Sequence, residues 1–124
     1  MALPQQPLLV VISANGVLDQ EPRDYPLALT LLYRWMLIAI YDDKRIMEST
    51  LEKMRPSGAY LLVRPSVLND EPSRGIEAIR QGTTNEPVQG WSISREDVGL
   101  WIYERVIKPS DRSSIVNNGF VITY

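Results

Sequence analysis

Short apolar runs alternate with longer helical patterns along this chain. Two apolar runs occupy residues 7–13 and 59–64, and a turn that contains Gly or Pro follows each of them. Continuous apolar runs of this length are typical of strands buried on both faces of a parallel sheet. Weaker runs at 88–93 and 119–124 predict two further strands.

Two helices are predicted between these strands. Asp24 is a suitable N-cap, Pro26 suits a first helical turn, and helix formers then continue to Met54. Residues 94–97 (SRED) match a capping box, which predicts a second helix that ends near Ile107.

The segment 66–87 is rich in Pro and Gly, which predicts a long loop with at most a short helix over 74–80. Strands that alternate with helices in this order favour an α/β fold. We therefore expect a single domain over residues 1–124, with a small, mostly parallel sheet and a long central helix.

The first half of the long helix is apolar on all sides. In residues 27–41, 13 of 15 positions are apolar. Such a helix is either buried in the core or covered by a second copy, so we expect a homodimer through this helix or through an open sheet edge. Trp35 and Trp101 are predicted to be core residues. The run is shorter than the about 20 residues that span a membrane, so no membrane contact and a cytoplasmic location are expected.

Composition narrows the chemistry. The 124 residues include 13 Lys and Arg against 15 Asp and Glu, a net charge of −2, which gives no basic footprint for nucleic acid. The chain has no Cys and no His, which excludes disulfides, thiolate nucleophiles, Ser-His-Asp triads and the usual transition-metal ligands. No metal site is predicted, and any chemistry must use Ser, Tyr, Lys, Arg, Asp or Glu.

Four segments carry a resemblance to a known family. They are residues 10–17 (VVISANGV), 43–48 (DKRIME), 60–68 (YLLVRPSVL) and 93–98 (ISREDV). In order and spacing they resemble a strand, the helix after it, the next strand and a late helix of atypical short-chain dehydrogenases, in the NmrA-like, NAD(P)-binding branch. The resemblance covers only the C-terminal half of that family. It implies a truncated Rossmann-like domain, which is half of a doubly wound fold.

The resemblance also shows what is missing. Members of the family begin with a strand and a G-x-x-G-x-x-G turn, whose helix N-terminus binds the pyrophosphate. Glycines stand here at positions 16, 58, 75, 82, 90, 99 and 119, and none of them has that spacing. We therefore expect no cofactor to be bound tightly by this chain alone.

The candidate catalytic residues are Ser13, Tyr41 and Lys44. The resemblance implies that Ser13 matches the family's substrate-binding Ser and that Lys44 matches its Lys. In working reductases a Tyr stands four residues before that Lys, but Ile40 has this position here and Tyr41 lies about 100° further round the helix. The structural alternatives are a strand end for Ser13, a core or interface ring for Tyr41, and for Lys44 a solvated residue paired with Glu48.

Four further residues are candidates for substrate binding. Asn15 lies in the turn after the first strand, and Arg64 stands at the carboxyl end of the second, where α/β sheets bind ligands. Asp70 lies in the long loop, and Trp91 lies in a Gly-flanked segment where it could line an apolar pocket. For Arg64 the alternative is a structural role in binding loop carbonyls, and for Asp70 it is simple loop polarity.

Three functions remain open from the sequence. The first is a small enzyme derived from a reductase that isomerises, cyclises or rearranges a small apolar secondary metabolite without a cofactor. The second is a non-catalytic NmrA-like regulatory or interaction module. The third is a C-terminal fragment of an NAD(P)-dependent reductase.

Overall fold

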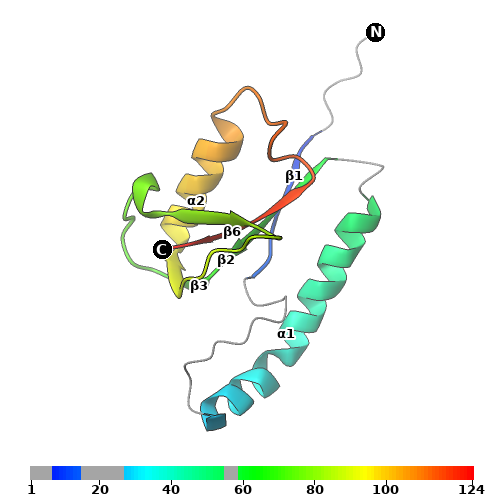
Figure 1. The fold of residues 1–124 in the computed structure, drawn as a ribbon, viewed down its shortest axis with the longest axis vertical. Coiled ribbons are helices and arrows are strands. Elements are labelled where there is room, and N and C mark those ends of the chain that lie inside the picture. The colour runs from blue at the N-terminus through cyan, green and yellow to red at the C-terminus, as the bar shows by residue number, and fades with distance from the viewer. Residues whose placement is uncertain (1–6, 15–26, 55–58) are drawn as a thin grey trace.

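The computed structural model describes residues 7–14, 27–54 and 59–124 (Figure 1). Its main sheet has four strands in the order β1 (Leu9–Ile12), β2 (Tyr60–Pro65), β6 (Asn118–Thr123) and β4 (Arg80–Thr83). The first three are parallel, and β4 is antiparallel to β6. The predicted α/β class with a mostly parallel sheet is confirmed.

A second, smaller sheet pairs β3 (Val67–Asn69) with β5 (Ser92–Ser94) in parallel. β3 follows β2 directly along the chain, and β5 lies beside Tyr124, the residue directly after β6. The Val67 N–H donates to the carbonyl of Trp91 at 3.1 Å, and the Tyr124 N–H donates to that of Ser92 at 3.2 Å. The small sheet is thus joined to the edge of the main sheet where its parallel strands end.

Helix α1 (Leu27–Met54) follows β1, as the sequence predicts. Helix α2 (Arg95–Ile102) begins where the capping pattern predicts, because the Ser94 hydroxyl accepts a hydrogen bond from the Asp97 N–H at 3.1 Å. It continues into a π-helical turn, η2 (Tyr103–Ile107).

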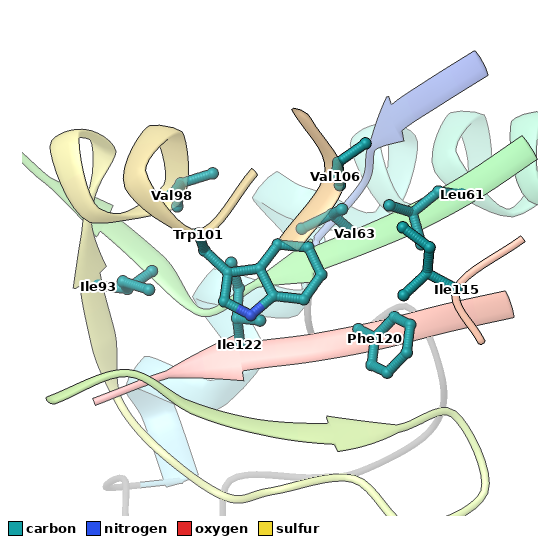
Figure 2. Close-up of a cluster of buried hydrophobic side chains, with 9 residues drawn as sticks. All are labelled: Leu61, Val63, Ile93, Val98, Trp101, Val106, Ile115, Phe120 and Ile122. Atoms are coloured by element: carbon teal, nitrogen blue, oxygen red, sulfur yellow. The ribbon is translucent and has the colours of Figure 1, made fainter. Parts of the chain in front are cut away.

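The main core lies between the sheet and α2 (Figure 2). Trp101 is 1% exposed, and its ring lies 5.7 Å from that of Phe120, so the core prediction for Trp101 is confirmed. Leu61 and Val63 of β2 face α2 together with Ile122, because alternate residues of a strand share a face. On the other face, Leu51 of α1 packs against Tyr60 and Leu62.

Two predictions about the fold are wrong. Trp35 is not in the core: it is 77% exposed on α1. The segment 66–87 is not one long loop, since it contains β3 and β4, although the short helix expected within 74–80 is present as a 3-10 turn, η1 (Ile76–Ala78). β4 has the sequence RQGT, which shows no apolar alternation, and only its pairing with β6 makes it a strand.

Candidate functional site

The site is built at the carboxyl ends of β1 and β2, which lie side by side. Ile12 is in register with Val63, and the Ser13 N–H donates to the Val63 carbonyl at 2.8 Å. Ser13 therefore lies next to Arg64 at this edge of the sheet. Helix α1 runs antiparallel to both strands and carries Glu48 over them.

Glu48 joins the two strand ends. Its Oε1 accepts a hydrogen bond from Ser13 Oγ at 2.6 Å and another from Arg64 Nε at 3.0 Å. Its Oε2 accepts from Arg64 Nη2 at 2.6 Å. The ion pair is bidentate, and the side chains of Arg64 and Glu48 are only 7% and 11% exposed. Two parallel charge-assisted bonds fix both groups in one orientation.

The network continues across the sheet to β4. Arg64 Nη1 donates to Thr84 Oγ1 at 2.8 Å, and Thr84 lies directly after β4. β6 crosses between them at Gly119, where a Cβ atom would lie 2.6 Å from Thr84 Oγ1. Glycine at 119 therefore leaves the space through which Arg64 reaches Thr84. We call Ser13, Glu48, Arg64 and Thr84 the polar row.

The residues around Glu48 keep its carboxyl group ionised. Burial alone would raise the pKa of Glu48, but hydrogen bonds from Arg64 and Ser13 and the charges of Arg64 and Lys44 lower it below its ordinary value. A carboxylate held in this way is a weak base. Glu48 therefore serves to anchor α1 and to position its neighbours rather than to accept a proton.

Lys44 stands one turn before Glu48, at the rim of the polar row. It is partly exposed, and its Nζ donates to the Ile12 carbonyl at a long 3.4 Å. Ile40 precedes Lys44 by a further turn and is 53% exposed. Residues four apart are neighbours on a helix, so an accessible ammonium group and an apolar side chain adjoin each other beside the carboxyl edge. We call these two residues the open corner.

The seven predicted site residues fall into four groups. Ser13, Lys44 and Arg64 come together around Glu48, although Ser13 and Arg64 are themselves buried. Asp70 forms an exposed ion pair with Arg95 instead. Asn15 and the side chain of Tyr41 lie outside the described residues.

Trp91, the remaining candidate, is 60% exposed and lies beside the exposed Val67 of β3. Trp91 therefore lies where the small sheet joins the main sheet.

Sequence reasoning missed two members of the polar row. From the sequence, Glu48 is a predicted ion-pair partner of Lys44 and the last residue of the segment 43–48 that resembles the family, and neither feature predicts that it joins the two strand ends. Thr84 gave no signal, because its position depends on the long-range pairing of β4 with β6.

A second polar cluster surrounds Asp97 at the start of α2. Asp97 is fully buried and accepts hydrogen bonds from the Ser73 hydroxyl, from the Arg74 N–H at 2.8 Å and from the Tyr124 hydroxyl. Burial alone would raise the pKa of Asp97, but these bonds lower it below its ordinary value. The carboxylate ties loop 70–75 and the end of β6 to α2.

The N-terminus of α2 does not fit the pyrophosphate of a dinucleotide. That group is usually bound by free N–H groups at a helix N-terminus. At α2 the Asp97 N–H is already bonded to Ser94, and the first turn carries the carboxylates of Glu96 and Asp97, which repel phosphate. β2 continues into β3 rather than into a helix. Within residues 7–14, 27–54 and 59–124, no group of three or more acidic side chains could hold a metal ion.

Known proteins with similar sequences support the resemblance. Residues 5–109 match the model of a family described as NAD(P)H-binding. The chain is 35% identical over 128 residues to reductase pytE of Aspergillus terreus, covering 95% of this chain and 48% of that protein. It is 36% identical over 112 residues to oxidase pynE of Aspergillus niger, covering 82% of this chain and 40% of that protein. The chain thus spans half or less of the length of these relatives.

Solved structures with the same fold give the same coverage. A short-chain dehydrogenase/reductase from Veillonella parvula, solved in complex with NADP, is similar with a TM-score of 0.67 and 18% identity, over 93% of this chain and 49% of that one. Its ethylated form gives a TM-score of 0.66. At this identity the likeness concerns the fold alone.

Within the described part of the chain, no helix combines the length and apolar character that a membrane crossing requires.

Proposed function

The chain belongs to the NAD(P)H-binding family, and from this premise we propose that it is a reductase-derived half-domain that binds a small, largely apolar molecule and transfers protons without a cofactor of its own. The observation that carries this proposal is the open corner: Lys44 stands accessible beside an apolar Ile40, at the edge where parallel α/β sheets bind their ligands.

Each member of the site has a separate task in this proposal. The Lys44 ammonium donates a hydrogen bond to a carbonyl oxygen of the bound molecule and stabilises the negative charge that develops there as an enolate forms. The carbon-bound proton passes to solvent at the open edge and returns at another carbon, which completes an isomerisation. The buried polar row does not touch the molecule; it holds α1, and therefore Lys44, against the strand ends.

Ile40 argues for chemistry without hydride transfer. The resemblance implies a Tyr at this position in working reductases, where its phenol donates the proton that completes a reduction. An aliphatic side chain cannot donate a proton but does extend the apolar surface beside Lys44. Isomerisation, cyclisation or rearrangement of a small apolar metabolite needs an oxygen-binding cation and an apolar wall, and both adjoin here.

The experiment uses 2-tetralone, an apolar ketone whose carbon-bound protons exchange through an enolate. In D₂O, followed by NMR, we expect the chain to raise the exchange rate at least about tenfold above matched buffer. Lys44→Met should remove this increase. The control, Lys53→Met, removes an exposed lysine in the last turn of the same helix and should keep it. An exchange rate equal to buffer, or one unchanged in Lys44→Met, would overturn the proposal.

A second candidate is favoured by the lengths of the relatives. Because the chain covers only 48% of a protein named a reductase, its residues could form the substrate side of an NAD(P)H-dependent reductase whose other half binds the cofactor. Two measurements separate the candidates. Deuterium exchange catalysed by this chain alone supports the first candidate. The second is supported if this chain catalyses no exchange and a protein that contains both halves consumes NADPH.

A further inference from the structure

The Lys44 ammonium has more donors than the described part of the chain uses. It carries three N–H groups. Within residues 7–14, 27–54 and 59–124 its one hydrogen-bond acceptor is the Ile12 carbonyl, at 3.4 Å. That carbonyl belongs to β1, an edge strand of the main sheet. Two donors of the open corner therefore remain for a ligand.

The described carboxylates near Lys44 are poorly placed to take a proton from that ligand. Both oxygens of Glu48 accept hydrogen bonds within the polar row. Asp42 and Asp43 are exposed, and at about 100° per residue they lie about 160° and 100° around α1 from Lys44. The proton of a bound molecule is therefore expected to leave to water, as it does in the proposed function.

This arrangement favours molecules that ionise easily. A 1,3-dicarbonyl compound has an acidic carbon between two carbonyl groups, because both oxygens share the negative charge of its enolate. The C–H bond at that carbon breaks near neutral pH: the proton goes to water, and the electron pair spreads over the two oxygens. A simple ketone has one oxygen and needs a much stronger base. A site that offers a cation but no well-placed base therefore selects the first class.

We propose, on the basis of the function proposed above, that the open corner binds the enolate of an apolar 1,3-dicarbonyl compound in preference to a simple ketone. The two remaining N–H groups of Lys44 donate to the two enolate oxygens, one to each. The apolar part of the molecule packs on Ile40, which is 53% exposed one turn earlier in α1. The enolate also forms an ion pair with the ammonium, which a neutral ketone cannot do.

The surroundings of the open corner admit such an anion. Glu48, one turn along α1, is neutralised by its bidentate pair with Arg64. Asp42 and Asp43 are exposed, so solvent and salt screen their repulsion. Figure 1 shows that the N-terminal half of α1 continues beyond the end of β1, which leaves this part of the helix uncovered by the main sheet.

The test uses benzoylacetone, an aryl 1,3-diketone whose neutral and enolate forms absorb at different wavelengths. The diketone is titrated with pH in the presence of a saturating excess of the chain and followed by absorbance. We expect the enolate to bind at least about tenfold more tightly than the neutral form, which moves the half-titration point of the diketone about one pH unit lower. Butyrophenone, the matched monoketone, should bind at least about tenfold more weakly in equilibrium dialysis at a pH where the diketone is ionised.

Variants of Lys44 assign the effect to the open corner. Lys44→Met should abolish the movement of the half-titration point, and Lys44→Arg, which keeps a cation with several donors, should keep most of it. The control, Lys53→Met, removes an exposed lysine in the last turn of the same helix and should leave it unchanged. Circular dichroism of the three variants should match that of the unmodified chain.

Three results would overturn the assignment. Equal binding of benzoylacetone and butyrophenone, lost in Lys44→Met, overturns the substrate class but keeps the open corner as a site for carbonyl compounds. A movement of the half-titration point that persists in Lys44→Met places the anion elsewhere on the chain. Binding of neither compound through Lys44 overturns the proposed function together with the substrate class.

Discussion

Replacing Glu48 with alanine is expected to lower the free energy of unfolding by about 3–5 kcal/mol, which is what removing one member of a buried ion pair usually costs. The Arg64 guanidinium, which donates two bonds to Glu48, would remain buried without its counter-charge. Ser13 would lose its acceptor as well. Urea denaturation followed by tryptophan fluorescence measures the change.

Two controls make the Glu48 result specific. Glu52→Ala removes an exposed carboxylate one turn later in α1 and should change stability by no more than about 0.5 kcal/mol. The double variant Glu48→Leu with Arg64→Met should recover most of the loss, because apolar groups of similar size often replace a buried ion pair without penalty. If Glu48→Ala costs no more than Glu52→Ala, the polar row does not hold α1 to the sheet.

Asp97→Ala is expected to lower the free energy of unfolding by about 3 kcal/mol, because it leaves the Arg74 N–H and the Ser73 hydroxyl without their acceptor. The loss should also loosen Arg74, whose guanidinium lies 4.1 Å from the centre of the Tyr124 ring. Asp70→Ala is the matched control, since it breaks only an exposed ion pair with Arg95 and should cost less than about 1 kcal/mol. Equal losses in the two variants would show that the Asp97 cluster contributes no more than a surface pair.

The pH dependence of Asp97 gives a second measurement. Its pKa is lowered in the folded chain, so the unfolded state binds more protons at mildly acidic pH. The stabilisation by Asp97 is thus complete above the unfolded pKa of about 3.9 and is lost as the pH falls through the folded value. The stability gap between the unmodified chain and Asp97→Ala should therefore close on acidification below about pH 4. A gap that widens in acid would contradict the lowered pKa.

Local sequence signals predicted most of the elements correctly. The apolar runs gave β1 and β2, and the capping pattern at Ser94 gave the start of α2. These signals are local, because the burial of a strand and the cap of a helix depend on a few neighbouring residues. Long-range pairing is not local, which is why β4 was missed.

Trp35 illustrates a different limit of the sequence. An apolar helix predicts burial, but it does not say what buries it. Residues 27–41 were expected either in the core or in a dimer, and the exposure of Trp35 removes the core for that residue. The apolar pattern of residues 27–41 is therefore compatible with burial inside one chain and with burial between two chains.

For the site, the sequence identified residues but not their relations. The resemblance pointed to Ser13 and Lys44, and strand position pointed to Arg64. The feature that unites them is Glu48, whose carboxylate lies on α1 between the two strand ends. Buried networks of this kind depend on which side of a helix meets the sheet, and a helix that is apolar on all sides gives little indication of that.

The burial of each site residue indicates whether it stabilises the fold or is accessible to a ligand. Ser13 and Arg64 are buried and bonded to Glu48, so they fix the geometry, whereas Lys44 is accessible and can meet a ligand. Substitutions in the polar row should therefore act first on stability. Substitution of Lys44 should act on binding and exchange with little effect on stability.

We propose that this chain carries the substrate side of its family's domain and lacks a dinucleotide site of its own. Isothermal titration calorimetry of the chain with NADPH tests it most directly. We predict no saturable binding up to about 1 mM NADPH, because the sequence has no G-x-x-G-x-x-G turn and the first turn of α2 is capped and acidic. Saturable binding of one NADPH per chain with a Kd in the micromolar range would contradict the account.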